Sequence, residues 1–296
     1  MAAIELQGLT KRFGAVAAVD DLDLDVAEGT VTGFLGPNGA GKTTTLRMLL
    51  GLVAPTTGRA TFGGTRYADL AEPARHVGAV LEASSFHPWR RAADHLRVLT
   101  SAIGVPDDRA ERALDQVGLA AHAHRRVGGF SLGMRQRLAL GAALLGDPAV
   151  LVLDEPANGL DPEGVHWLRT FLRSRADEGR TVLVSSHLLA EVAQTVDHVV
   201  ILDGGRLVAD APLGDLTDRS TAVVVRTPDA DRLHGALRAH AIAAVRSGPD
   251  ELTATGTTPE TLGRIMAAEG VVVVGMHVQH TDLEDVFLEL TEGSRS

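Results

Sequence analysis

The sequence predicts an α/β fold with a mixed, largely parallel sheet, an inserted helical segment and a small α+β domain at the C-terminal end. Three observations lead to this prediction. Short apolar strands bounded by turn residues alternate with helical segments. Strands vanish between Pro88 and Leu145, where helical periodicity dominates. Beyond residue 220 the segments follow the order β-α-β-β-α-β, which is typical of a ferredoxin-like fold.

The elements of the first part are defined by apolar runs and the turn residues that end them. A buried strand at 30–36 leads into a glycine-rich loop and a helix at 42–52, and a strand follows at 77–82. The helical subdomain then occupies about 88–145. After it, strands are expected at 149–156, 181–187 and 198–207.

A Pro/Gly/Asp-rich stretch, "APLGDLTDRS" at 211–220, predicts a boundary between domains at 1–215 and 221–296. In the second domain we expect strands and helices in the order strand 221–226, helix 229–240, strand 241–247, strand 250–255, helix 258–268 and strand 271–278. Thr258 is the expected N-cap of the second helix, with Pro259 at its first position. Thr281 and Glu284 form a capping box for a last helix. This domain is expected to serve dimerisation or regulation.

Composition narrows the class of protein. The chain has 296 residues, 45% apolar and 22% charged, which is typical of a soluble globular protein. Its net charge of −10 argues against a nucleic-acid partner, because phosphates attract a basic surface. The absence of cysteine excludes disulfides and thiolate chemistry. We expect neither a signal peptide nor a membrane span, since no apolar run approaches the ~20 residues needed. A cytoplasmic location fits these features.

The stretch "GPNGAGKT" matches the phosphate-binding pattern G-x-x-x-x-G-K-[ST] between a predicted strand and a predicted helix. Glycines let backbone amides converge on phosphates, and the helix N-terminus adds positive potential. Lys42 should reach the β- and γ-phosphates, and the Thr43 hydroxyl should bind Mg²⁺. A chance glycine-rich turn is disfavoured by the flanking elements. The candidate nucleotide-binding residues here are Gly36, Pro37, Asn38, Gly39, Ala40, Gly41, Lys42, Thr43 and Thr44.

Two carboxylates end the apolar strand in "LVLDEP". Asp154 would be buried there, which is costly without a cation, so it is a candidate Mg²⁺ ligand. Glu155 is expected to point to the opposite side and to orient attacking water or accept its proton; a surface glutamate that begins a loop is the alternative. His187, at the end of "TVLVSSH", would lie at the sheet edge where ligands bind and could contact the γ-phosphate. Taken alone, its position favours an ordinary edge histidine, since the chain holds 12 histidines.

These stretches occur in one order with "FSLGMRQR" and "NGLD", and the set resembles the ATP-binding subunit of ABC (ATP-binding cassette) transporters over about residues 3–215. The "SLGM-basic-QR" signature and the ending "DLEDVFLELT" are most similar to the drug- and antibiotic-exporter branch. The resemblance implies a P-loop NTPase cassette that hydrolyses ATP with Mg²⁺.

The resemblance also implies roles for residues outside the phosphate loop. Phe13 falls where an aromatic ring stacks on adenine, although its residue type alone suggests a core position. The signature residues that contact ATP in trans are Ser131, Leu132, Gly133 and Met134. Leu132 replaces a commoner glycine and Met134 a commoner glutamine. Asp161 matches an aspartate that bridges two nucleotide sites, and a turn role fits it as well.

Glu82 stands where most members have a glutamine that touches Mg²⁺ and senses the transport partner. A carboxylate also offers oxygen to Mg²⁺, so Glu82 is a candidate metal ligand; an exposed loop acid is the alternative. The stretch 82–97, with Phe86, Pro88 and Trp89, is a candidate docking surface for a permease. Trp89 would equally suit a core.

By resemblance, two such subunits pack head to tail as a homodimer or heterodimer, with each ATP between one phosphate loop and the other signature. A separate transmembrane permease is implied, so the chain is expected on the inner face of the cell membrane. The alternatives are a non-transport ABC ATPase acting on ribosomes or nucleic acid, and a regulatory subunit with weak turnover. The net negative charge and the single cassette disfavour the non-transport ATPase. The presence of Glu155 disfavours the regulatory subunit.

Overall fold

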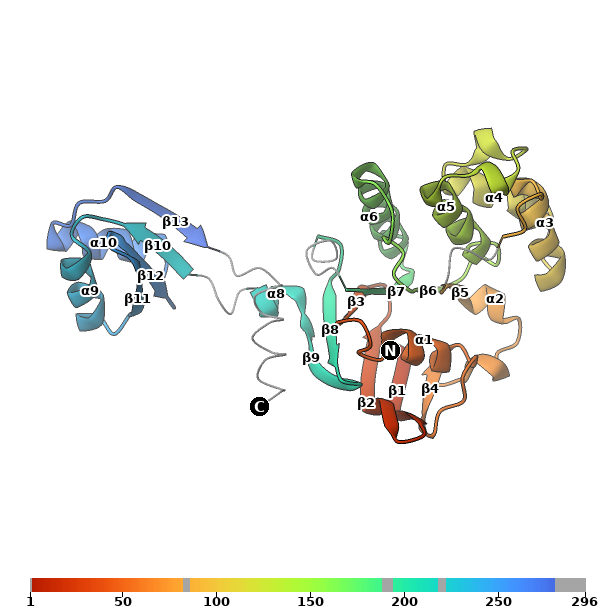
Figure 1. The fold of residues 1–296 in the computed structure, drawn as a ribbon, viewed down its shortest axis with the longest axis horizontal. Helices are drawn as coiled ribbons and strands as arrows, with labels where there is room; N and C mark the ends of the chain where they lie inside the picture. Colours follow the sequence, from red (N-terminus) through yellow and green to blue (C-terminus); the bar gives the residue numbers. More distant parts are fainter. Residues whose placement is uncertain (1, 82–85, 188–193, 218–221, 280–296) are drawn as a thin grey trace. The chain divides into compact units, whose positions relative to one another are not determined.

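The computed structural model describes residues 2–81, 86–187, 194–217 and 222–279 (Figure 1). The chain divides into two compact units, Met1–Ala211 and Pro212–Ser296. Each unit has its own hydrophobic core, so each is described by itself. Among the helices of the described ranges, none is long and apolar enough to cross a membrane.

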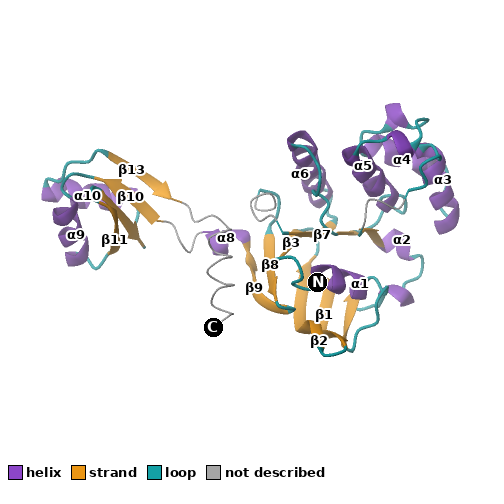
Figure 2. Ribbon diagram, viewed as in Figure 1, coloured by secondary structure: helices purple, strands orange, loops and turns teal. Residues whose placement is uncertain are grey.

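A six-stranded sheet forms the centre of the first unit, in the order β5-β6-β7-β3-β8-β9. Figure 2 labels four of its strands, β3, β7, β8 and β9. The strands from β5 to β8 are parallel to their neighbours. The bounds are β3 Val31–Leu35, β5 Val77–Val80, β6 Val150–Leu153, β7 Thr181–Ser186, β8 His198–Asp203 and β9 Arg206–Pro212. Every residue of β3, β6 and β7 is buried, as expected for parallel strands covered on both faces.

The register of these three strands brings the sequence motifs to one edge of the sheet. Leu35 of β3 is paired with Ser186 of β7, and Leu153 of β6 is paired with Val184. The segments that follow β3, β6 and β7 therefore leave the sheet side by side, at the edge where α/β proteins bind ligands. The helices of the sheet layers are α1 Lys42–Leu49, α2 Pro73–His76 and α6 Pro162–Asp177, with a short 3₁₀ turn at Tyr67–Asp69.

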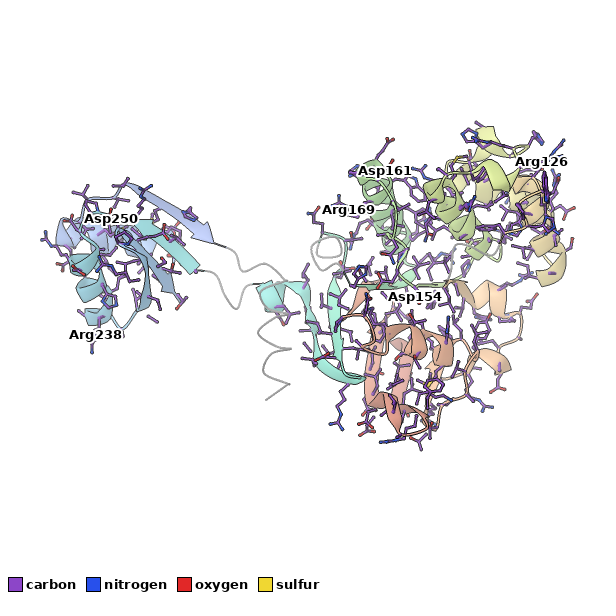
Figure 3. All side chains as sticks on the ribbon, viewed as in Figure 1. Arg126, Asp154, Asp161, Arg169, Arg238 and Asp250 are labelled. Atoms are coloured by element: carbon purple, nitrogen blue, oxygen red, sulfur yellow. The ribbon has the colours of Figure 1, made fainter. Side chains whose placement is uncertain are left out.

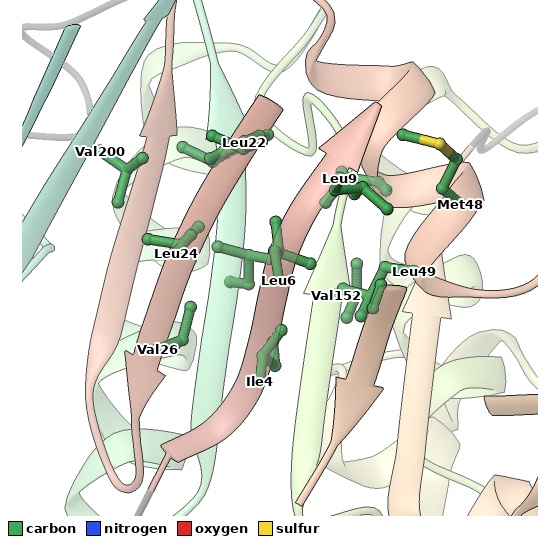
Figure 4. Packing of buried hydrophobic residues seen from close by; sticks show 14 of the residues in the cluster. Ile4, Leu6, Leu9, Leu22, Leu24, Val26, Met48, Leu49, Val152 and Val200 are labelled. Carbon is green, nitrogen blue, oxygen red and sulfur yellow. The ribbon is translucent and has the colours of Figure 1, made fainter. Parts of the chain in front are cut away.

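The N-terminal part forms an antiparallel sheet in the order β2-β1-β4, which the sequence analysis did not predict. Its strands are β1 Ala2–Phe13, β2 Val16–Ala27 and β4 Thr57–Phe62. The second half of β2 alternates buried and exposed residues, so one face packs on the core. Figure 4 shows that core, in which leucines and valines of β1 and β2 pack with Met48 and Leu49 of α1 and with Val152 and Val200 of the central sheet.

The segment from 88 to 145 is helical, as predicted. It contains α3 Ala92–Ile103, α4 Asp108–Gln116 and α5 Leu132–Ala143, with 3₁₀ turns at Ala120–His122 and Val127–Gly129. Within the described residues of this segment, the only β pairing is an isolated bridge between Arg91 and Arg126. This helical subdomain carries the predicted signature at the start of α5.

One predicted strand is wrong in extent. The run 198–207 is not a single strand, because β8 ends at Asp203 and β9 begins at Arg206. The two glycines between them have φ of 55° and 83°. A two-residue glycine turn of this kind reverses the chain into an antiparallel hairpin.

The second unit begins with α8 Leu213–Thr217 and contains a four-stranded antiparallel sheet in the order β11-β12-β10-β13. The sequence of elements is β10 Ala222–Arg226, α9 Ala230–Ala239, β11 Ala243–Gly248, β12 Glu251–Thr255, α10 Pro259–Glu269 and β13 Gly275–Gln279. This confirms the predicted ferredoxin-like arrangement. Thr258 caps α10 by accepting a bond from the Thr261 amide at 3.3 Å, as expected. The capping box predicted at Thr281 lies outside the described residues.

Candidate functional site

The glycine-rich loop joins β3 to α1 and has a backbone path that demands glycine. Gly41 has a φ of 100°, and a Cβ on it would lie 2.4 Å from the carbonyl oxygen of Ala18. The loop closes on itself through the Ala40 amide, which donates to the Pro37 carbonyl at 3.1 Å. The Thr45 amide then donates to the Gly41 carbonyl at 2.9 Å, which starts the helix. Residues 38–44, Ala18 and Glu155 line an open cavity of about 510 Å³ here.

Lys42 is nearly buried inside this loop. Its side chain is 6% exposed, and its Nζ donates to the carbonyl oxygens of Gly36 at 2.6 Å and Pro37 at 3.2 Å. The Nζ also lies 3.5 Å from Oε1 of Glu155. The ammonium group of Lys42 is therefore held between the phosphate loop and the carboxylate of Glu155, which follows another strand. Such a position suits contact with a bound phosphate.

Asp154 follows β6 and is 8% exposed (labelled in Figure 3). Oδ2 accepts the Thr43 hydroxyl at 2.7 Å, and Oδ1 accepts the Ser185 hydroxyl at 2.5 Å. A buried carboxylate beside a threonine hydroxyl is an oxygen donor set that fits Mg²⁺. Thr43 and Asp154 are thus brought together as the sequence predicted for two metal ligands.

Glu155 does not point away from Asp154, so the predicted opposite orientation is wrong. Its φ is 48°, in the left-handed region, and this breaks the alternation of the strand. Its amide donates to the Ser185 hydroxyl oxygen at 2.9 Å. Its carboxylate lies between two polar groups, with Oε2 at 2.8 Å from Nδ1 of His187 and Oε1 near Lys42. Both carboxylates therefore face the phosphate loop.

His187 is placed by β7 and is about one-third exposed on its side chain. Its imidazole contacts Glu155, which is unlike an isolated histidine at a sheet edge. Ser185, two residues earlier, is fully buried and bonds both Asp154 and Glu155. Ser185 is not among the predicted site residues, although a serine at the end of an otherwise apolar strand was an available signal. Its hydroxyl therefore links the Asp154 carboxylate to the backbone amide of Glu155.

The signature residues lie in the helical subdomain. Ser131 is the N-cap of α5, and its Oγ accepts the Met134 amide at 3.2 Å. Leu132 is half exposed, and Gly133 and Met134 are partly exposed. These four residues are not among the described residues that line the phosphate-loop cavity. The signature therefore presents an accessible helix start that is separate from the chain's own loop.

Asp161 caps α6, where Figure 3 labels it. Its Oδ1 accepts the Gly164 amide at 2.8 Å, and Pro162 occupies the first helical position. The turn role that the sequence allowed for Asp161 is therefore present in the structure. Asp161 is an exposed residue, so this role is compatible with further contacts.

Two aromatic residues that would have suited a core are exposed, and the core interpretation is wrong for both. Phe13 ends β1 and is 56% exposed, with Nζ of Lys11 at 5.1 Å from its ring centroid. Trp89 is 71% exposed, and the Arg126 guanidinium lies 5.6 Å from its ring. Both rings are available to a ligand or partner. Glu82, the remaining candidate metal ligand, lies outside the described residues.

A glycine-rich loop between strand and helix, with a lysine, a threonine hydroxyl and two strand-end carboxylates around it, defines a P-loop nucleoside triphosphatase. Comparison with known proteins makes the class more specific. Residues 19–158 match the family described as ABC transporter, and residues 221–284 match a domain of unknown function.

Similar proteins extend the match over the whole chain. The bacitracin transport ATP-binding protein BcrA of Bacillus licheniformis is 36% identical, covering 98% of this chain and 97% of its own length. The Nod factor export ATP-binding protein I of Cupriavidus pinatubonensis is 35% identical, covering 98% and 91%. A solved ATP-binding subunit of an ABC transporter is 30% identical, with a TM-score of 0.65, covering 72% and 91%. The chain belongs to the ABC transporter family and has its ATP-binding, ATP-hydrolysing cassette.

Proposed function

We propose that this chain is the ATP-hydrolysing subunit that powers export of a small molecule, such as a drug or antibiotic, through a separate membrane permease. The observation that supports this most is the arrangement of Lys42, Glu155 and His187 around the phosphate loop, with Thr43 and Asp154 beside them. The names of the two relatives, one a bacitracin transport protein and one a Nod factor export protein, point to export.

The residues of the site have distinct roles in this proposal. The amides of residues 38–44 and Nζ of Lys42 bind the phosphates, and the exposed ring of Phe13 stacks on adenine. The oxygens of Thr43 and Asp154 hold Mg²⁺, and Glu82 offers a further oxygen. When bound, Mg²⁺ would neutralise charge that develops on the phosphates. The substrate of transport is set by the permease rather than by these residues.

Glu155 is the proposed general base or water-orienting group, and His187 the proposed γ-phosphate contact. The 2.8 Å contact between them keeps the Glu155 carboxylate aimed at the site. Nζ of Lys42 lies 3.5 Å from Oε1 of the same carboxylate. Ser185 adds a fixed backbone contact to Glu155. The catalytic carboxylate is therefore held between His187 and Lys42, and Ser185 holds the backbone that carries it.

The second half of each site comes from another ATP-binding subunit, in a homodimer or a heterodimer. The Ser131 hydroxyl, the Gly133 amide and the positive end of α5 bind the γ-phosphate of the partner's nucleotide. Leu132 and Met134 lie beside them, and Asp161 bridges the two sites. The accessible start of α5 supports this role. ATP then holds two subunits together, and its hydrolysis lets them part.

Closure of the two subunits is passed to the permease through residues 82–97. The exposed Trp89 ring supports a docking role for this stretch, together with Pro88 and Phe86. The subunit works on the inner face of the cell membrane, where the permease holds it. The ferredoxin-like unit contributes to dimerisation or regulation.

A pull-down from detergent-solubilised membranes tests the proposal. The tagged chain with Glu155→Gln is incubated with ATP to stabilise the closed dimer. Recovery of a multi-span membrane protein supports export, and Trp89→Ala should lower that recovery while ATP binding is unchanged. Recovery of ribosomes or nucleic acid in its place refutes the proposal and favours a non-transport ATPase.

A further inference from the structure

The start of α5 and the loop before α6 are connected by two reciprocal contacts between leucine and glycine. A Cβ placed on Gly159 would lie only 2.2 Å from Cδ2 of Leu132, so the leucine side chain lies directly on that glycine. In the second contact the loop supplies the leucine and α5 the glycine: a Cβ placed on Gly133 would lie 3.5 Å from Cδ2 of Leu160. We name these four residues the leucine–glycine interlock.

Gly159 is required for this packing for two reasons. Its φ of 72° is in the left-handed region, where a side chain is strained. The space that its side chain would occupy is also filled by Leu132. Although Leu132 is 50% exposed, its position is thus set by a close contact rather than by solvent.

A further contact joins α5 directly to α6. The guanidinium carbon of Arg137 in α5 lies 4.1 Å from the ring centroid of Trp167 in α6. A cation over an indole face at this distance is an attractive interaction. Two separate contacts therefore connect the signature helix to α6 and to the loop that precedes it.

The loop that carries Gly159 begins at Glu155 and is itself hydrogen-bonded. The Asn158 amide donates to the Glu155 carbonyl at 3.2 Å, and the Leu160 amide donates to the Ala157 carbonyl at 3.1 Å. Asp161 then caps α6. Successive turns of this kind leave few free torsions between Glu155 and Leu160. A displacement at one end of the loop is therefore transmitted to the other.

We propose that Leu132 is a positioning residue that links the signature to the loop of this chain's own catalytic carboxylate. The inference rests on the proposed function, in which Glu155 serves the chain's own nucleotide and Ser131 serves the partner's. Through the interlock, the two groups that one chain contributes to two different ATP sites move together. The interlock gives Leu132 a physical role at a position where glycine is commoner in the family.

The first test uses hydrogen exchange of the ATP-free full-length chain. Leu132→Ala should accelerate exchange of the amides of residues 157–161 several-fold, because those amides lie in turns that Leu132 covers. Leu132→Met fills similar space and should restore slow exchange. Leu52→Ala removes a more exposed leucine, 66% exposed, from another part of the unit and should leave 157–161 unchanged. Unchanged exchange in Leu132→Ala overturns the proposal.

The second test separates positioning from folding. Leu132→Ala should lower kcat roughly tenfold, since small misplacements of catalytic groups are costly, while the ATP affinity of the monomer stays within about twofold. Leu132→Met, which fills similar space, should restore most of the lost kcat, and Leu52→Ala should keep the wild-type kcat. Leu160→Ala should act like Leu132→Ala, and the double variant should be no slower than either single variant. A wild-type kcat in Leu132→Ala, or effects that multiply in the double variant, overturns the proposal.

The two tests also distinguish this proposal from the proposed function. Exchange is measured without nucleotide, so it reports the interlock even if Glu155 is not the catalytic group. If Glu155→Gln hydrolyses ATP at the wild-type rate, the proposed function fails whatever the exchange result.

Discussion

Replacing Glu155 by glutamine tests the centre of the proposed mechanism. Glutamine has the same length and tolerates the same backbone, and its side-chain oxygen can stay near Nζ of Lys42, which lies 3.5 Å from the native carboxylate. What is lost is the ability to accept a proton and the negative charge. The substitution therefore removes chemistry while keeping the loop, the lysine and the Thr43–Asp154 pair in place.

The expected loss follows from the role assigned to the carboxylate. General-base catalysis typically contributes about 10²- to 10⁴-fold, so kcat should fall by that factor, or roughly 3–5 kcal/mol in the barrier. Nucleotide binding should be unchanged or tighter, because a negative charge beside the phosphate cavity is removed. ATP-driven dimers should accumulate, since hydrolysis no longer separates them.

Phosphate release, equilibrium ATP binding and gel filtration with ATP measure these three expectations. Glu72→Gln is the matched control, because Glu72 also has a left-handed φ, 51°, but its side chain is 64% exposed and pairs with Arg75. That variant should hydrolyse ATP normally. Turnover of Glu155→Gln within about twofold of wild type would refute the assignment of Glu155 as the general base.

Three further changes have defined outcomes. Ser131→Arg should abolish ATP-driven dimerisation in light scattering while the monomer still binds ATP; weaker monomer binding would instead assign Ser131 to its own chain's site. Burial, with the nearby Arg90 charge, lowers the pKa of His95 below 6.5, so His95 is neutral when folded. The contribution of neutral His95 to the free energy of unfolding is fully present above pH 6.5 and is lost as the pH falls through the lowered pKa. His95→Phe should therefore reduce the drop in Tm between pH 7.5 and 5.5. A drop equal to that of the wild type would contradict this reasoning. Thr258→Ala removes the cap of α10 and should destabilise the second unit by about 1 kcal/mol in calorimetry, whereas an unchanged unfolding transition would assign no stability to the cap.

The candidate site was predictable where the chemistry depends on local sequence. The phosphate loop needs glycines at fixed offsets, and the strand and helix around it could be recognised from apolar runs. Asp154 could be singled out because a buried carboxylate needs a partner, and the structure places Thr43 beside it. The ferredoxin-like order was also predictable, since each of its elements is short and bounded by its own turn.

Predictions failed where the outcome depends on backbone torsion or on neighbours distant in sequence. Alternation along a strand predicted that Glu155 points away from Asp154, but a left-handed φ reverses it. For Phe13 and Trp89 the residue type left a core position open as an alternative, yet both are exposed, because exposure depends on what packs nearby. In the N-terminal sheet, β4 pairs with β1 although α1 lies between them in the sequence, whereas the β1–β2 hairpin is local and its pattern was overlooked.

The sequence alone determined the phosphate loop, the alternation of strands and helices and the order of the ATP-binding motifs, because these follow from residue type and spacing. The tertiary structure decided which of those residues meet. Pairing of β3, β6 and β7 brings Lys42, Glu155 and His187 within hydrogen-bonding range, although the chain separates them by more than 100 residues in one case and about 30 in the other. It also placed Leu132 on Gly159, a contact between separate elements that no local pattern encodes. Strand pairing and side-chain packing set these distances, so only the folded chain could show them.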